Sequence, residues 1–331
     1  MPGTLRWGIL GPGYIAAAQT ADLVGNGFAV AAVGSRSQDS ARSFADRFGI
    51  PAAYGSYAEL VADPDIDIVY IATPHSFHYR HARLALEAGK HVLLEKSFTV
   101  TGDQAAALVE LAESKGLVLL EAMWTRFLPH MVRIRELLAA GTIGEVRTLI
   151  ADHNQKLSTD PLSRINNPEL AGGALLDIGV YPVSFAFDIF GPPATVQAHA
   201  SSTATGVDRQ TTIIFSYDSG ASAVLQTALD TVGPNTATIL GTEGWIAIDA
   251  VWYAPTKFTV HSSSGAVIEA FEADVSPRGM QYQAAELERL IEEGETTGTI
   301  LSPTESVAIM RTLDEIRAQI GLDYPADILS L

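Results

Sequence analysis

Three side chains that can hold or exchange protons stand in mostly apolar parts of this sequence. Lys96 follows the run His91–Leu94, and Asp177 and Tyr181 lie within Gly172–Pro182. A charged group in an apolar stretch is costly to bury unless it is paired or used. A tyrosine alone is a poor base at neutral pH, because its ordinary pKa is about 10, but a nearby ammonium group lowers that value. A lysine, a tyrosine and a carboxylate can therefore take the proton of a substrate hydroxyl.

The same residues also admit purely structural explanations. Lys96 can pair with Glu95 or lie in solvent at a strand exit, Asp177 can cap a helix, and Tyr181 can pack in a core. Tyr181 follows Asp177 by four residues, the spacing of one helical turn, so both side chains can share one edge in either case. The residue types alone leave both explanations open.

Residues Gly11–Ala16 read Gly-Pro-Gly-Tyr-Ile-Ala and lie between a strand-like run and a helix-like stretch. Gly11 permits a tight turn, and Gly13 lets the backbone approach a diphosphate. Tyr14 and Ile15 would open the helix, whose first amides face the phosphates. A glycine turn without a ligand is the alternative. The position between strand and helix favours a dinucleotide site.

The second apolar run ends in Gly34-Ser35-Arg36-Ser37, where a site for NAD usually carries an acidic residue. No acid occupies this stretch, and the nearest is Asp39. Arg36 can stack on adenine and pair with a 2′-phosphate, and Ser35 and Ser37 add hydroxyl groups. The alternative is a solvated arginine in a loop. The stretch predicts NADP as the cofactor, with NAD still possible.

The third run ends in Ala72-Thr73-Pro74-His75, with His78 and His81 beyond it. Ligands of open α/β sheets bind at the carboxyl ends of the strands, so Thr73 and Pro74 are expected near the nicotinamide side of the cofactor. Three histidines at this spacing can suggest a metal site, but no carboxylate pattern or cysteine accompanies them. We expect no metal, and polar histidines near a helix start, one or two of them facing the cleft.

Short apolar runs alternate with helix-like stretches through the first third of the chain. The runs are apolar on consecutive residues, which is typical of strands covered on both faces. Alternation at this spacing predicts a doubly wound α/β domain. The predicted strands are Leu5–Leu10, Phe28–Gly34, Ile66–Ala72, His91–Leu94 and Leu117–Leu120, and the predicted helices are Ile15–Val24, Ser40–Phe48, Phe77–Ala88 and Asp103–Lys115.

The pattern changes near residue 122, and strand-like segments then follow one another with Gly and Pro between them. Consecutive strands without intervening helices predict a largely antiparallel or mixed sheet. We place the domains at residues 1–122 and 123–331. The predicted strands are Val146–His153, Val196–Ser201, Thr211–Tyr217, Ala221–Ala228, Ala237–Leu240, Trp245–Ile248, Phe258–His261 and Val267–Phe271, and the helices are Met131–Ala140, Gln281–Glu293 and Pro303–Ile320.

Composition excludes several classes of function. The 331 residues include no cysteine, which excludes disulfides and thiolate chemistry. The formal charge of −17 disfavours nucleic acid and anionic lipid as partners. We expect no apolar stretch long enough to cross a bilayer, no secretion signal, and a cytoplasmic location.

Taken together, these motifs make the sequence similar to the Gfo/Idh/MocA oxidoreductase family over nearly the whole chain, and within it to the branch of dimeric dihydrodiol dehydrogenases and sugar dehydrogenases. The resemblance rests on the order and spacing of five stretches, which are Gly11–Ala16, Ala72–His75 with His78, Glu95-Lys96, Glu121–Phe127 and Gly172–Pro182. It implies an N-terminal Rossmann domain that binds NAD(P) and a C-terminal, substrate-binding α/β domain built on a large, mostly antiparallel open sheet. It also implies hydride transfer between the cofactor and a sugar, polyol or trans-dihydrodiol.

The resemblance further implies roles for single residues. Lys96, Asp177 and Tyr181 correspond to the catalytic positions, although Ser97 replaces the family's usual proline and Tyr181 replaces a histidine found in many members. We assign Tyr181 as acid/base, Lys96 as its electrostatic partner and Asp177 as the orienting group, with Lys96 and Tyr181 exchangeable. His75, His78, Glu95 and Lys96 join the predicted cofactor contacts, and the predicted substrate contacts are Trp124, Arg126, Phe127 and Trp252.

Two other functions remain compatible with this resemblance. One is a catalytically silent, cofactor-binding regulator, and the other is a glycosidase that keeps NAD bound. Apolar residues on both faces of the second-domain strands, such as Val224 with Leu225, also predict a homodimer or homotetramer formed through the C-terminal sheet.

Overall fold

A computed structural model describes residues 5–331 of the chain. The chain forms two compact units. The first contains the residues up to Trp124 together with Ser276–Val307 and Leu329–Leu331, and the second contains Thr125–Val275 and Ala308–Ile328. The sequence predicts a single boundary, between residues 122 and 123, and no local pattern indicates that Ser276–Val307 belongs to the first unit.

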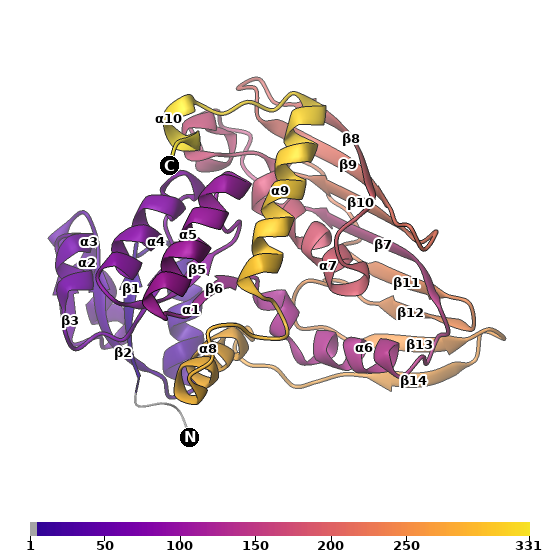
Figure 1. The fold of residues 1–331 in the computed structure, drawn as a ribbon, viewed down its shortest axis with the longest axis horizontal. Coiled ribbons are helices and arrows are strands. Elements are labelled where there is room, and N and C mark those ends of the chain that lie inside the picture. The colour runs from indigo at the N-terminus through magenta and orange to yellow at the C-terminus, as the bar shows by residue number, and fades with distance from the viewer. Residues whose placement is uncertain (1–4) are drawn as a thin grey trace. The chain divides into compact units, whose positions relative to one another are not determined.

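The first unit is built on a six-stranded parallel sheet in the order β3-β2-β1-β4-β5-β6. All four residues of β4 are fully buried, and β5 and β6 are almost as enclosed, as expected for strands covered on both faces. Figure 1 shows the helices packed around this sheet. The elements are β1 (Arg6–Leu10), α1 (Tyr14–Gly25), β2 (Ala29–Gly34), α2 (Gln38–Phe48), β3 (Ala52–Tyr54), α3 (Tyr57–Ala62), β4 (Ile68–Ile71), η1 (His75–Phe77), α4 (His78–Glu87), β5 (His91–Glu95), α5 (Gly102–Lys115), β6 (Leu119–Ala122) and α8 (Gln281–Glu293).

The doubly wound α/β prediction is confirmed, and each predicted strand and helix of this region is present with small changes at its ends. Strand β3 and helix α3 are not in the sequence prediction. Strand β3 has three half-buried residues, so no apolar run marks it. Helix α3 has six residues and begins after Ser56, whose hydroxyl accepts a hydrogen bond from the Glu59 amide.

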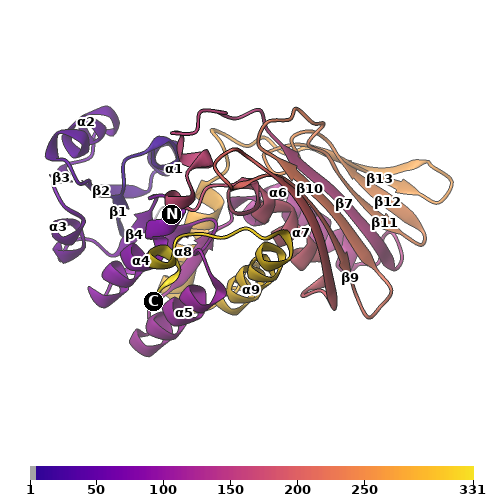
Figure 2. The same cartoon turned by 90° about the horizontal axis from the view of Figure 1, so that it is seen from above.

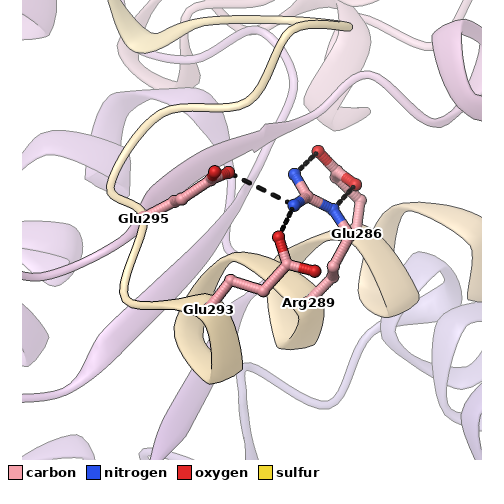
Figure 3. A network of polar contacts seen from close by, with 4 residues as sticks. All are labelled: Glu286, Arg289, Glu293 and Glu295. Carbon is pink, nitrogen blue, oxygen red and sulfur yellow. Dashed lines mark hydrogen bonds and ion pairs between the residues drawn. The ribbon is translucent and has the colours of Figure 1, made fainter.

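Helix α8 ends in a charged network around Arg289 (Figure 3). Its guanidinium makes two hydrogen bonds to Glu286 and further ion pairs with Glu293 and Glu295. Gly294 adopts a left-handed conformation at the helix end, which turns the chain so that Glu295 faces the same guanidinium. These glutamates keep the pKa of Arg289 above its ordinary value.

The second unit contains an eight-stranded sheet in the order β14-β13-β12-β11-β7-β10-β9-β8, in which only β7 and β10 pair in parallel. The prediction of a large, mostly antiparallel sheet is confirmed. The elements are η2 (Trp124–Phe127), which begins at the end of the first unit, α6 (Pro129–Ala139), β7 (Val146–Asn154), η3 (Arg164–Asn166), η4 (Pro168–Leu170), η5 (Leu175–Gly179), α7 (Val180–Phe190), β8 (Thr195–Ser202), β9 (Asp208–Ser216), β10 (Ser222–Ala228), β11 (Ala237–Gly241), β12 (Gly244–Ile248), β13 (Phe258–Ser262), β14 (Val267–Phe271), α9 (Pro303–Ile320) and α10 (Ala326–Leu329).

One face of this sheet is covered by helices. Figure 2 shows α6, α7 and α9 on that face, and within the described residues no helix of the unit lies on the other face. Burial alternates along β9 and β10, because successive side chains point to opposite faces of a strand. The sheet is therefore open on one side.

The helical stretch Pro168–Phe190 corrects one sequence expectation. It is 23 residues long, and an 18-residue window within it has a mean hydropathy of 1.5, which is sufficient for a membrane span, whereas we expected no such stretch. Of that window, 94% is buried in the structure, as is typical of the core helix of a protein. The η5 part of this stretch is a π-helical turn, which widens the hydrogen-bond ladder shortly before Pro182, a residue without an amide hydrogen.

Asp188 on α7 binds two arginines in the interior of the second unit. Its carboxylate lies 3.2 Å from the Arg126 guanidinium and 2.8 Å from that of Arg135, and the side chains of Asp188 and Arg126 are 4% and 3% exposed. Removal of one partner from a buried pair leaves an uncompensated charge, which typically costs about 3–5 kcal/mol.

We therefore expect Asp188→Ala to lower the free energy of unfolding by about 3 kcal/mol or more, measured by urea denaturation. The matched control is Asp249→Ala, which removes an exposed carboxylate lying 3.9 Å from Lys257. Its expected loss is below about 1 kcal/mol, because exposed pairs contribute little. Equal losses for the two variants would contradict the structural role of Asp188.

Candidate functional site

The turn after β1 has no room for a side chain at Gly11. Its φ of +91° lies in the left-handed region, and a Cβ there would approach the Thr73 methyl group to 2.9 Å. The Gly11 amide donates to the carbonyl of Gly34 at 3.1 Å, which joins the end of β1 to the end of β2. Glycine is thus required at this position by both backbone conformation and packing.

Gly13 leaves open space in front of helix α1. A Cβ at Gly13 would have no protein atom within 4 Å, and no side chain caps the helix. The first turn contains no acidic residue, and Tyr14 is 83% exposed. The first amides of a helix need acceptors and carry partial positive charge. The arrangement fits the diphosphate of a dinucleotide, as the motif predicts.

In the stretch after β2, Arg36 lies between Ser35 and Ser37, and the hydroxyl oxygens of both serines accept hydrogen bonds from backbone amides. The Ser35 hydroxyl accepts from the Ser37 amide, and the Ser37 hydroxyl caps α2 by accepting from the Ser40 amide. Both hydroxyl hydrogens are still available to donate to a phosphate. The Arg36 side chain is exposed.

The loop after β4 is held by histidines. The two ring nitrogens of His78 lie 2.8 Å from the carbonyl oxygens of Thr73 and Ser97. Burial lowers the pKa of His78 to about 4, so the neutral ring donates to one of these carbonyls at neutral pH. His78 is fully buried and His75 is 3% exposed, which favours supporting roles over the predicted direct cofactor contacts. In residues 5–331 no three histidine or acidic side chains form a metal-binding group.

The end of β5 carries Glu95 and Lys96. The Glu95 carboxylate, 4% exposed, accepts from the Tyr70 hydroxyl at 2.5 Å and from the Lys96 backbone amide at 3.2 Å. Glu95 therefore shapes the strand end, and a direct cofactor contact by its carboxylate stays a prediction. The Lys96–Ser97 peptide bond is cis.

In the second unit, one helical stretch carries Asp177 and Tyr181. Both side chains are largely buried, and each residue is 8% exposed. Arg164 lies 3.1 Å from an Asp177 carboxylate oxygen. The helix begins over Asp208, whose carboxylate accepts from the Leu175 amide at 2.8 Å and from the Thr211 hydroxyl at 2.7 Å. Burial raises the pKa of Asp208 to about 6.

Two aromatic residues that the sequence analysis did not single out pack against Tyr181. The His153 ring lies edge-on at 4.9 Å and the Tyr253 ring at 5.5 Å, and these two rings stack on each other at 3.6 Å. Gln155 joins them through a 2.8 Å contact with His153 and a 3.4 Å hydrogen bond to the Tyr253 hydroxyl. His153 is buried next to the last residue of β7, and a histidine near a strand end was the available signal.

The four predicted substrate contacts are all buried. Trp124 is 2% exposed and receives the Arg278 guanidinium over its ring at 5.3 Å, and Phe127 is 4% exposed. Arg126 belongs to the buried pair with Asp188. Trp252 is fully buried, stacks on Phe185 at 5.0 Å and donates to the Asp152 carbonyl at 2.7 Å. These partners favour structural roles for Arg126 and Trp252 over the predicted substrate contacts.

Comparison with known families gives two matches that together span most of the chain. Residues 5–123 match the oxidoreductase family with an NAD-binding Rossmann fold, and residues 131–247 match the GFO/IDH/MocA C-terminal domain.

Individual proteins match over almost their full length. A D-xylose 1-dehydrogenase (NADP(+)) from Hypocrea jecorina is 39% identical, covering 98% of this chain and 94% of the relative. A trans-1,2-dihydrobenzene-1,2-diol dehydrogenase from Mus musculus is 36% identical, covering 98% and 99%. Among solved structures, a 3-ketoreductase from Actinomadura kijaniata in complex with NADP and TDP-benzene superimposes with a TM-score of 0.84 at 27% identity, covering 96% and 98%.

Gly13 offers a sharp test of the dinucleotide site. The Gly13→Ala variant is expected to fold normally, because the added methyl group meets no protein atom within 4 Å. The same methyl group would occupy the approach of the diphosphate, so affinity for the dinucleotide should fall at least about tenfold. Thermal unfolding and titration calorimetry measure the two effects. Wild-type affinity in this variant would show that the diphosphate lies elsewhere.

Proposed function

Because the chain belongs to the Gfo/Idh/MocA oxidoreductase family, we propose that it is an NADP-dependent dehydrogenase or reductase acting on a small sugar, polyol or diol. The observation that carries the proposal is the uncapped start of α1 behind Gly11 and Gly13, with Arg36 at the end of the next strand. The first feature suits a diphosphate, and the second suits a 2′-phosphate.

The substrate class follows from chemistry that the relatives share. The named substrates of two relatives are D-xylose and a trans-dihydrodiol of benzene. Both carry hydroxyl groups on neighbouring carbons. We propose a substrate of this kind, with one carbinol carbon exchanging a hydride and a neighbouring hydroxyl serving for recognition.

Three residues share the proton chemistry in this proposal, while the bound cofactor supplies the hydride acceptor or donor. Tyr181 takes the hydroxyl proton during oxidation and returns it during reduction. The Lys96 ammonium stabilises the phenolate and the developing alkoxide. Asp177 orients a substrate hydroxyl, and its neighbour Arg164 holds the carboxylate in place.

The surroundings of Tyr181 suit this role. The His153 and Tyr253 rings pack against the phenol ring and limit its rotation. The Asp208 contacts hold the first turn of the same helical stretch, so Asp177 and Tyr181 project from a fixed segment. Fixed side chains lower the cost of reaching the reactive arrangement.

The test is reduction of NADP in the presence of aldoses, inositols, anhydrosugars and aromatic dihydrodiols. We expect net NADP reduction with at least one class, and a fall in kcat of about 100-fold or more for Tyr181→Phe and Lys96→Met, with the Kd of NADP changed little for Tyr181→Phe. Tyr217→Phe is the matched control, because it removes a tyrosine hydroxyl elsewhere in the second unit. If Tyr181→Phe keeps full turnover while Lys96→Met loses it, the two roles are exchanged.

The same assay addresses the two rival functions. A silent regulator would bind the cofactor without turnover of any substrate. A glycosidase with resident NAD would release sugar without net reduction of added cofactor. Net NADP reduction excludes each as the main activity.

We also propose that the protein is a homodimer or homotetramer through the open face of the eight-stranded sheet. Ile150, Val224 and Ile214 lie side by side on three neighbouring strands of this face and are 48%, 38% and 41% exposed. A contiguous apolar row on an uncovered sheet is typical of an interaction surface. A second copy of the same face would bury it in a two-fold arrangement.

Light scattering tests the assembly. Wild-type protein should have at least twice the monomer mass, and Val224→Glu should shift the mass toward the monomer, because it places a charge in the centre of the row. Val232→Glu changes an equally apolar but 79% exposed residue outside the sheet and should leave the mass unchanged. A monomeric wild-type protein would contradict the proposal.

A further inference from the structure

Arg278 is a partly buried arginine in the segment that leads into α8 of the first unit. Its guanidinium lies over the ring of Trp124, 5.3 Å from the ring centre. Within residues 5–331 this guanidinium forms no ion pair. The chain has 38 acidic residues against 21 basic ones, so a partly buried arginine without a carboxylate partner is a feature that calls for an explanation.

Other partly buried arginines of this protein are paired. Arg135 has a side chain that is 23% exposed and lies 2.8 Å from Asp188, and Arg317 is 14% exposed and lies 2.9 Å from Asp314. Arg317 also lies over a tyrosine ring, at 5.5 Å, so contact with an aromatic ring does not replace the carboxylate there. A charge that is partly withdrawn from water is costly unless an opposite charge compensates it. Arg278 is therefore a candidate to bind an anion that the chain does not supply.

The backbone at Arg278 is fixed to α1, the helix that opens the predicted dinucleotide site. The buried carboxylate of Asp22 accepts hydrogen bonds from the Arg278 amide at 3.2 Å and from the Met280 amide at 2.6 Å. The Gln19 side chain accepts a further hydrogen bond from Gln283 at 2.9 Å. Each oxygen of the Asp22 carboxylate thus binds a backbone amide, and the segment that carries Arg278 is held in place.

Trp124 brings Arg278 to the carboxyl edge of the parallel sheet. Strand β6 ends at Ala122, which pairs with Glu95 at the end of β5, so Trp124 and Lys96 follow neighbouring strand ends. Trp124 is 2% exposed whereas Arg278 is partly exposed, so a ligand at this place would meet the arginine rather than the indole. Ligands of open α/β sheets bind at this edge.

The contact with the ring leaves the arginine able to bind an anion. The electron-rich face of an indole attracts a guanidinium without using its N–H donors, whereas a carboxylate partner would occupy two of them. Those donors match the oxygens of a carboxylate or a phosphate in pairs. The net charge of −17 repels anions in general, so an anionic substrate needs local cations. Arg278 and Lys96 supply two at this edge of the sheet.

We propose that Arg278 binds an anionic group of the substrate, a carboxylate or a phosphate, and that the protein therefore prefers acidic or phosphorylated sugars to neutral ones. The inference rests on the proposed dehydrogenase or reductase function and adds the charge of the substrate to it. Arg278 takes no part in the hydride transfer, so its effect is on substrate affinity and on kcat/KM.

The experiment compares D-glucose, D-glucuronate and D-glucose 6-phosphate, which differ only in the group on the last carbon. Titration calorimetry measures the Kd of each for the full chain with NADPH bound, and NADP reduction gives kcat/KM. We expect the wild-type protein to bind at least one anionic compound about tenfold or more tightly than glucose, as for a hydrogen bond to a charged group. The two anionic compounds show whether a carboxylate or a phosphate is preferred. The preference should weaken at high salt.

Variants of Arg278 link this preference to one side chain. Arg278→Gln should lower the preference for the anionic compound about tenfold or more, and Arg278→Lys should keep only part of it, because an ammonium group retains the charge but not the paired donors. Arg47→Gln is the matched control. Arg47 lies over the ring of Phe48 at 4.8 Å in the last turn of α2, so the control removes one charge from a similar pair in the same unit. It should leave the preference unchanged.

The outcomes separate this inference from the proposed function. If the wild-type protein prefers neither anionic compound in affinity or in turnover, or if the preference survives in both Arg278 variants, the role of Arg278 is overturned, and NADP reduction by a neutral sugar or diol leaves the proposed function intact. If no compound of the wider panel reduces NADP, the proposed function is overturned. Calorimetry with the same variants then still decides whether Arg278 binds the anion.

Discussion

The close contact between Thr73 and Gly11 is the constraint on which the cofactor side of this protein depends. The absence of a Cβ at Gly11 lets the Thr73 methyl group pack directly on the first turn. The carbonyl oxygen of Thr73 lies 2.8 Å from His78, whose other ring nitrogen contacts the carbonyl oxygen of Ser97, the residue after Lys96. The Thr73 hydroxyl lies 3.0 Å from His81, whose ring packs against Tyr57. One threonine thus connects the diphosphate turn with the loop that follows the proposed catalytic lysine.

The second unit positions its proposed catalytic residues through a different interaction. Asp208 on β9 accepts hydrogen bonds from Leu175 and Thr211 and lies directly under Gly173, whose φ of +119° brings the backbone close. The Tyr324 hydroxyl donates to the neighbouring Gly172 carbonyl at 2.6 Å. These contacts hold the start of a buried helical stretch, so Asp177 and Tyr181 extend from a segment with little freedom to move.

Strong apolar periodicity made most of the fold predictable. Most strands of both sheets and the long helices other than α7 were placed correctly, because consecutive apolar runs and helical spacing reflect burial directly. The short elements β3 and α3 were missed, since three half-buried residues and a six-residue helix leave no such pattern. Tyr57 lies on the missed helix α3, so the sequence did not indicate its contacts. His153 and Tyr253 were also not predicted, because their packing on Tyr181 depends on which strands and loops become neighbours in the second unit.

The sequence by itself determined the glycine turn, the identity of Arg36 at the end of the second strand, and the residue types that can carry out proton transfer. These features are local, because a turn conformation or the missing acid after β2 involves only a few consecutive residues. Tertiary structure alone decided which side chains became partners. In the second unit, Arg126 pairs with Asp188 and Trp252 donates to the Asp152 carbonyl. In the first unit, the His78 ring contacts two carbonyl oxygens from separate loops. Such pairings join residues far apart along the chain, and no short-range pattern encodes them.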